Sequence, residues 1–144
     1  MKTTELALLL DRFMRKIHFG LQSKAASFDT EKVGPGGGII LLTLADMGCT
    51  SLHELTRRVS RDKSQMTRSI RSLEAKGLVK RETSPEDARV SLVSLTKDGE
   101  RVVGELQDAV ADTIGDLLAP LPDAEAARLK RLLAQVVSDN PSSD

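Results

Sequence analysis

The side chains best suited to chemistry in this chain are two arginines with short polar neighbours. On a helix over residues 62–77, Arg68 and Arg71 share one face, opposite apolar residues spaced three and four apart. An arginine can donate two hydrogen bonds to guanine O6 and N7, and it binds phosphate equally well. A short helix with this outward face is shaped to enter the major groove of DNA. The alternative is an ordinary solvated helix face.

Polar residues near the start of the same helix extend the predicted DNA-binding surface. Ser64, Gln65 and Thr67 lie where short side chains and free backbone N–H groups can meet a phosphate. The alternative is that at least one of the three is only helix surface. The neighbouring cations are predicted to be backbone contacts or solubility charges, with no ranking among them: Arg57, Arg58, Lys63, Lys80 and Arg81.

A further arginine, Arg89, follows the turn 84–88 of a predicted hairpin. At a hairpin tip its guanidinium can reach a narrow minor groove, whose negative potential attracts it. The alternative is an ordinary exposed ion pair with Asp87, worth ~0–1 kcal/mol.

Charge is distributed unevenly along the chain, although the formal net charge is zero. Residues 1–56 hold six basic and six acidic side chains, residues 57–97 hold eleven and five, and residues 98–144 hold four and ten. A basic middle block in a neutral chain is typical of a DNA-binding lobe on an acidic scaffold.

With three Phe and no Trp or Tyr, the chain lacks the aromatic platforms that single-stranded nucleic acid needs.

Other functional classes find little support in the sequence. There is no glycine-rich phosphate loop after a strand, no nucleophile elbow and no metal-ligand spacing, so we predict no enzyme, no cofactor and no metal site. The apolar run 6–10 is too short for a membrane span and no signal-peptide cleavage pattern follows, which predicts a cytoplasmic protein. Cys49 has no adjacent basic residue, so a buried or neutral thiol is predicted. Phe13 and Phe19 are predicted core residues.

Periodicity and turn residues predict a mainly α fold with a small β-hairpin wing. Ser51 and Asp62 stand at N-cap positions, Thr96 can cap a later helix, and Gly77 is a C-terminal stop. The segment 33–38 is rich in glycine and predicts a break between helices. The six predicted helices cover about 5–28, 39–47, 51–59, 62–77, 96–118 and a stretch after Pro122, and the strands cover 78–83 and 89–95.

Five short motifs occur in order between Ser51 and Gly99. They are Glu54-Leu55, Thr67-Arg68, the run LEAKGLVKR at 73–81, Asp87-Ala88-Arg89, and LTKDG at 95–99. Together they resemble the MarR (multiple antibiotic resistance regulator) family of winged helix-turn-helix repressors.

The resemblance implies a homodimer that binds a palindromic operator and is often released by a small-molecule effector. It implies an N-terminal dimerisation helix (1–34), a winged helix-turn-helix lobe (35–97) and C-terminal dimerisation helices (98–138). The tail 139–144 is predicted to be disordered. The resemblance also implies that Asp87 holds Arg89 in place rather than contacting DNA.

Two places differ from the family pattern. Gly37 and Gly38 stand where a Gln and a bulky apolar residue are usual, next to the usual ligand cleft. We interpret the segment 34–38 as a candidate hinge, since glycine absorbs backbone change without a side-chain clash. Ser60-Arg61 stands where a Gly and an apolar residue are common, and we expect an exposed Arg61 that adds a phosphate contact.

The leading hypothesis is therefore a ligand-responsive dimeric repressor that binds double-stranded DNA. The alternative is a winged-helix module for protein contact without a DNA role, because the fold alone does not specify a nucleic-acid function.

Overall fold

The computed structural model describes residues 3–138, which form six helices and three short strands. This confirms the predicted mainly α fold with a wing. In chain order the elements are α1 (Thr4–Phe28), α2 (Gly34–Met47), β1 (Thr50–Ser51), α3 (Leu52–Val59), α4 (Lys63–Ala75), β2 (Val79–Thr83), β3 (Ser91–Leu95), α5 (Lys97–Leu118) and α6 (Asp123–Val137).

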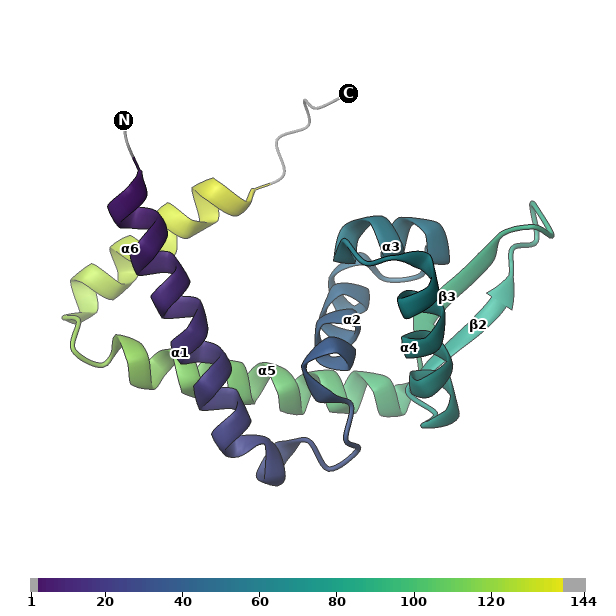
Figure 1. Cartoon of the computed structure of the whole chain (residues 1–144), viewed down its shortest axis with the longest axis horizontal. Coiled ribbons are helices and arrows are strands. Elements are labelled where there is room, and N and C mark those ends of the chain that lie inside the picture. The colour runs from purple at the N-terminus through teal and green to yellow at the C-terminus, as the bar shows by residue number, and fades with distance from the viewer. Residues whose placement is uncertain (1–2, 139–144) are drawn as a thin grey trace.

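The long helix α5 runs through both halves of the molecule (Figure 1). One half contains α1 and α6, and the other contains α2, α3, α4 and the sheet, which we call the winged-helix lobe. Helices α1 and α2 both pack against α5. The crossing of α1 over α5 is close, because a methyl group on Gly20 would lie only 2.7 Å from Thr113 Cγ2.

The apolar core fills the winged-helix lobe and fixes the position of α4. Helix α4 buries Met66, Ile70 and Leu73, the three residues predicted to share its inner face. They pack in one cluster with α2, α3, the sheet and the first turns of α5, whose buried members include Ile40, Leu41, Leu44, Leu55, Leu78, Val79, Val93, Val102 and Val103.

Side-chain caps set the start of each helix around α4. Ser51 Oγ accepts the backbone N–H of Glu54 at 3.1 Å, and an Asp62 carboxylate oxygen accepts that of Gln65 at 2.8 Å. Thr96 Oγ1 accepts the N–H of Gly99 at 3.0 Å and donates to the carbonyl of Gly77 at 2.6 Å. All three predicted caps are confirmed.

The end of α4 is a Schellman turn. Gly77 has a φ of +74°, which glycine adopts without strain. Its N–H donates to the carbonyl of Glu74 at 3.0 Å, and the N–H of Leu78 donates to that of Leu73 at 3.0 Å. The predicted stop at Gly77 is confirmed, and it turns the chain from α4 directly into β2.

Two features of the fold differ from the prediction. The wing has three antiparallel strands in the order β1-β3-β2, because Thr50 and Ser51 pair with Val93 and Leu92 of β3. Helix α2 begins at Gly34, so the predicted break at 33–38 is wrong from that residue onward. The actual break lies just before it, where Lys32 has a φ of +55°.

The two helices at the other end of the molecule leave apolar side chains in solvent. Helix α6 has no buried residue, and Leu132, Leu133, Val136 and Val137 are 48–79% exposed. Several leucines of α1 are also exposed. Phe19 is 73% exposed, so its prediction as a core residue is wrong. The predicted disordered tail 139–144 lies outside the described residues. No described helix is both long and apolar enough to span a membrane.

Candidate nucleic-acid interface

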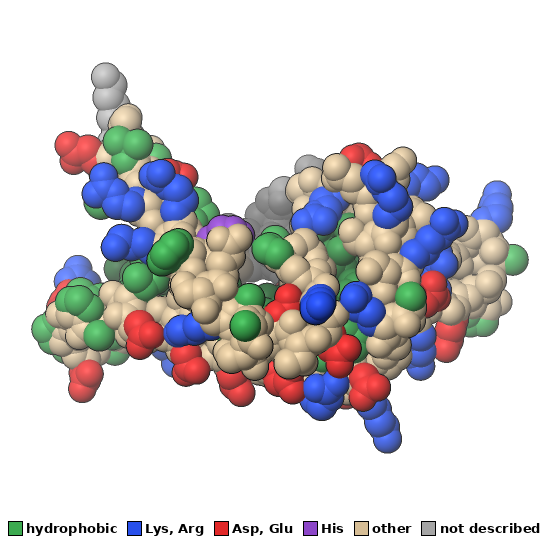
Figure 2. Space-filling view, turned by 60° about the horizontal axis from the view of Figure 1, so that its bottom comes forward, with side chains coloured by type: hydrophobic (Ala, Val, Ile, Leu, Met, Phe, Trp, Pro, Cys, Tyr) green, Lys and Arg blue, Asp and Glu red, His purple; other side chains and the backbone are tan. Residues whose placement is uncertain are grey.

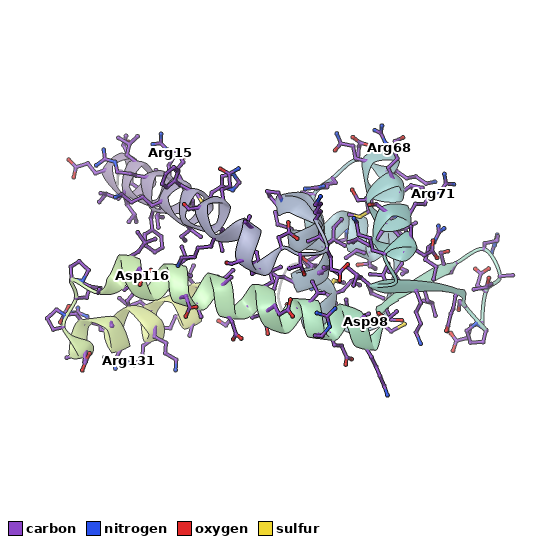
Figure 3. The ribbon with its side chains drawn as sticks, turned by 90° about the horizontal axis from the view of Figure 1, so that it is seen from below. Arg15, Arg68, Arg71, Asp98, Asp116 and Arg131 are labelled. Atoms are coloured by element: carbon purple, nitrogen blue, oxygen red, sulfur yellow. The ribbon has the colours of Figure 1, made fainter. Side chains whose placement is uncertain are left out.

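Helix α4 presents a polar face directly opposite its buried one. Ser64, Gln65, Arg68 and Arg71 are exposed, while Met66, Ile70 and Leu73 on the other side of the helix are buried. Figure 3 shows Arg68 and Arg71 pointing away from α5 and outward from the winged-helix lobe. The structure thus brings the two predicted arginines together on one open helix face.

Within residues 3–138, these two arginines have no acidic partner. Among the salt bridges of residues 3–138, none involves Arg68 or Arg71. An arginine without a partner keeps all its donors available for an incoming base or phosphate. In Figure 2, basic side chains gather over the winged-helix lobe, and acidic ones line the lower edge of the view.

Several neighbouring cations are engaged within the protein. Arg81 Nη2 lies 3.0 Å from Glu74 Oε1 and its Nε lies 3.4 Å from Oε2, which ties β2 to α4. Both side chains are partly buried. Lys80 pairs with Glu82 at 3.7 Å, and Arg57 with Glu54 at 3.4 Å. Arg81 is therefore part of the frame that holds α4, a role that the prediction of a backbone contact or solubility charge did not include.

The polar residues at the start of α4 differ in what they can offer. Ser64 and Gln65 are exposed. Thr67 is half-buried, and its hydroxyl donates to the carbonyl of Lys63 at 2.8 Å. The backbone N–H of Gln65 donates to the N-cap Asp62, as predicted, so this donor is not available to a phosphate. The first turn of α4 therefore presents the exposed side chains of Ser64 and Gln65 to a ligand.

At the tip of the wing, Arg89 is held by Asp87. Arg89 Nε lies 3.2 Å from Asp87 Oδ1 and Nη2 lies 3.4 Å from Oδ2, while the backbone N–H of Arg89 donates to Oδ1 at 3.0 Å. The Arg89 side chain is 91% exposed. The tip is a short turn closed by Ser84, whose N–H donates to the carbonyl of Val90 at 2.9 Å. The geometry orients the guanidinium while leaving it open to solvent.

The titration of Asp87 should report this arrangement. Hydrogen bonds from the Arg89 backbone, and then from its side chain, lower the pKa of the Asp87 carboxyl below its ordinary 3.8. A lowered pKa means that the charged form stabilises the wing above pH 3.8, and that this contribution is lost as pH falls through the folded-state value. We expect an NMR midpoint below 3.8 that rises only part-way in Arg89→Ala, because the backbone bond remains. A wild-type midpoint at or above 3.8 would contradict the arrangement.

Arg61 lies where the sequence did not place it. It is half-buried, and its guanidinium lies against the first turn of α2. A methyl group on Gly36 would lie 2.8 Å from Arg61 Nη2 and 2.9 Å from Nη1. The expectation of an exposed Arg61 is therefore wrong, because the absence of a side chain at Gly36 leaves room for it.

The glycines after Gly36 allow close helix packing. A methyl group on Gly38 would lie 3.2 Å from Leu106 Cδ2 of α5, and one on Gly37 would lie 3.0 Å from Val33 Cβ. The helix starts here because both carboxylate oxygens of Asp29 accept backbone N–H groups, from Val33 at 2.9 Å and Gly34 at 3.0 Å. Packing therefore accounts for these glycines within a helical segment.

Cys49 is exposed, so of the predicted buried or neutral thiol the buried alternative is wrong. Among residues 3–138, no three His, Cys, Asp or Glu side chains are grouped as metal ligands would be.

A cavity of about 510 Å³, which we call the interhelical cavity, lies between α1, α2 and α5. It is separate from the arginines of α4 and Arg89.

Residues 39–91, from within α2 to the first residue of β3, match the MarR family. This chain contains a MarR-family domain. The matched residues include α4, β2 and the tip of the wing, so they hold every residue predicted to contact DNA. The resemblance seen in the sequence motifs is confirmed.

Solved structures of MarR-family proteins share this fold. The apo form of wild-type MarR from E. coli has a TM-score of 0.76 at 24% identity, over 96% of this chain and 98% of that one. A MarR mutant in complex with operator DNA has a TM-score of 0.67 at 24% identity, over 96% and 99%. PcaV from Streptomyces coelicolor with its natural ligand has a TM-score of 0.65 at 25% identity, over 94% of each chain.

Among curated relatives, one from Thauera aromatica is described as a candidate transcriptional regulatory protein for the hcr operon. It is 33% identical over 107 residues, which are 74% of this chain and 64% of the relative. The chain spans about half to two thirds of the length of the curated relatives that it matches.

Proposed function

We propose that this chain is a transcriptional regulator that binds double-stranded DNA as a homodimer. In this proposal it is a repressor that recognises a palindromic operator in the cytoplasm, and a small molecule changes its affinity. Helix α4 enters the major groove with Ser64, Gln65, Thr67, Arg68 and Arg71, and Arg89 of the wing reaches the adjacent minor groove. Asp87 positions Arg89.

The observation that carries the proposal is the open face of α4. Arg68 and Arg71 are exposed and free of salt bridges within residues 3–138, whereas Arg81 and Arg57 are paired. Exposed cations repel one another, so their electrostatic energy falls when they bind a polyanion such as DNA. Binding also releases counterions from the DNA. A MarR mutant of the same fold binds operator DNA, which supports this role for the shared helix.

Removing Arg89 should weaken DNA binding without unfolding the protein. Its side chain is 91% exposed and its pair with Asp87 is open to water, so the melting temperature of Arg89→Ala should be unchanged. The loss of one phosphate or groove contact should lower affinity and reduce the slope of log K against log salt by about 1 per subunit. A gel shift on the promoter beside the protein's own gene, over a salt series, measures both.

The matched control is Arg15→Ala, since Arg15 is also an exposed arginine paired with a nearby aspartate, but lies on α1, away from the winged-helix lobe (Figure 3). It should leave affinity and salt slope unchanged. Wild-type affinity in Arg89→Ala would remove the wing from the proposed interface.

The proposed dimer is formed by residues 1–34 and 98–138. Exposed apolar side chains on α1 and α6 support it, because monomers rarely leave so many leucines and valines of neighbouring helices in water. Two copies would place two α4 helices on one side of a duplex. Operator half-sites one turn apart require these helices to be about 34–36 Å apart.

Placing charge on this apolar surface should separate the subunits. Wild-type protein should sediment at about twice the chain mass of 15.6 kDa. The double variant Leu133→Glu with Val136→Glu should sediment as a monomer, because two carboxylates would have to be desolvated at the contact. Gln135→Glu, on the same helix, adds a charge without removing apolar surface and should remain dimeric. A monomeric wild-type chain would refute the proposed assembly.

A further inference from the structure

The interhelical cavity is lined almost wholly by apolar side chains. At about 510 Å³ it has the size of a small-molecule site. Apolar residues reach it from all three surrounding helices, among them Met14 and Ile17 of α1, Leu42 of α2, and Leu106 and Val110 of α5. The polar side chains in its wall are His18, Gln22 and Asp29.

The described wall of the cavity holds no side chain with a fixed positive charge. No lysine or arginine is among the described residues that line it, and Asp29 is the one acidic residue of the wall. Both oxygens of Asp29 already accept backbone N–H groups at the start of α2. The fixed charge nearest to a bound molecule is therefore the negative charge of Asp29, whose oxygens are already hydrogen-bonded to the protein backbone.

We infer that the interhelical cavity binds an uncharged, largely apolar small molecule and excludes carboxylates. The inference rests on the proposed function, in which a small molecule controls DNA binding. A carboxylate that enters an apolar cavity loses its water and needs a cation or several donors in exchange. Here it would instead meet the charge of Asp29. A neutral ligand needs one polar contact at most, and Gln22 or His18 can supply it.

A pair of naphthalene compounds of matched size tests the chemical class. Calorimetry on the full chain should show methyl 2-naphthoate binding at least tenfold more tightly than 2-naphthoate. Tighter binding of 2-naphthoate would overturn the inference, and so would tighter binding of 2-naphthylmethylammonium, which would make Asp29 a recognition charge. If none of the three binds, the cavity is filled by the chain itself or by its partner subunit, and the inference also fails.

A designed cation should reverse the preference. Gln22→Arg adds a guanidinium at a polar, exposed position of the cavity wall, so folding should be unaffected. It should strengthen 2-naphthoate binding at least tenfold and change the ester little. Ser23→Arg, one residue along α1, exposed and absent from the wall, should leave both affinities unchanged. If both variants gain equally, the gain is a surface effect and the inference is wrong.

The same samples separate this inference from the proposed function. Ligand binding is measured on the free protein, and DNA binding is measured by gel shift without ligand. If the protein binds DNA but prefers 2-naphthoate, only the ligand inference fails. If it binds methyl 2-naphthoate preferentially but ignores duplex DNA, the ligand inference stands as a property of the cavity and the proposed function fails.

Discussion

Arg68→Glu should lower the affinity for operator DNA by about 100-fold or more. A bidentate contact between an arginine and a guanine is worth about 1–3 kcal/mol, and 3 kcal/mol corresponds to a factor of about 150. Reversing the charge also introduces repulsion from the phosphates. Because a homodimer carries the substitution twice, the loss applies at both half-sites. A gel shift or fluorescence anisotropy at fixed salt measures it.

The fold should tolerate this change. Arg68 is exposed and makes no salt bridge within residues 3–138, so the melting temperature of Arg68→Glu should be close to that of the wild type. Arg15→Glu reverses a charge on an exposed helix face of the other half. With sedimentation showing that this variant is still a dimer, it should bind DNA normally.

The same variant separates the two functional hypotheses. A winged-helix module used only for protein contact would not bind duplex DNA with an affinity that depends steeply on salt. Arg68→Glu would then have no DNA binding to weaken. A folded Arg68→Glu protein that binds DNA as tightly as the wild type would exclude α4 as the recognition helix.

Gly99→Ala should lower the free energy of unfolding by about 3 kcal/mol, the upper end of the usual cost of overpacking. The methyl group would overlap the carbonyl oxygen of Leu78 and lie 3.0 Å from its carbonyl carbon. This carbonyl cannot move freely, because it accepts the N–H of Thr96 at 3.1 Å. Thr96 also caps α5 through the N–H of Gly99, so three backbone segments meet at this point.

Thermal unfolding at fixed protein concentration measures the effect, since the stability of a dimer depends on concentration. We expect the melting temperature of Gly99→Ala to fall by about 10 °C. Gly104→Ala is the matched control on the same helix, because nothing lies within 4 Å of the added methyl group. It should be neutral or raise stability by about 0.5–1 kcal/mol, as alanine favours a helix over glycine. Equal effects in the two variants would show that the Leu78 contact is unimportant.

Local signals in the sequence predicted the elements around the candidate interface. The caps at Ser51, Asp62 and Thr96 involve side chains and backbone groups within three residues, so each could be found from the sequence alone. The inner face of α4 followed from the spacing of Met66 and Ile70 with Leu73. The open arginine face is the complement of that pattern, which is why its placement could be predicted as well.

Contacts between distant segments could not be predicted in this way. The strand at Thr50 exists only because β3 returns beside it, and the pairing of Arg81 with Glu74 depends on the angle between β2 and α4. The position of Arg61 depends on Gly36, a residue of another helix. Asp29 sets the start of α2 from outside the usual N-cap position, so glycine-rich sequence alone suggested a break.

The continuity of α5 has a mechanical consequence. With 22 residues at a rise of 1.5 Å each, this helix is a rod about 33 Å long that belongs to both halves of the molecule. A rod of that length, tilted by about 5° at one end, displaces its other end by roughly 3 Å. In the proposed dimer, a small change in angle at the far end of α5 would therefore change the spacing between the two α4 helices.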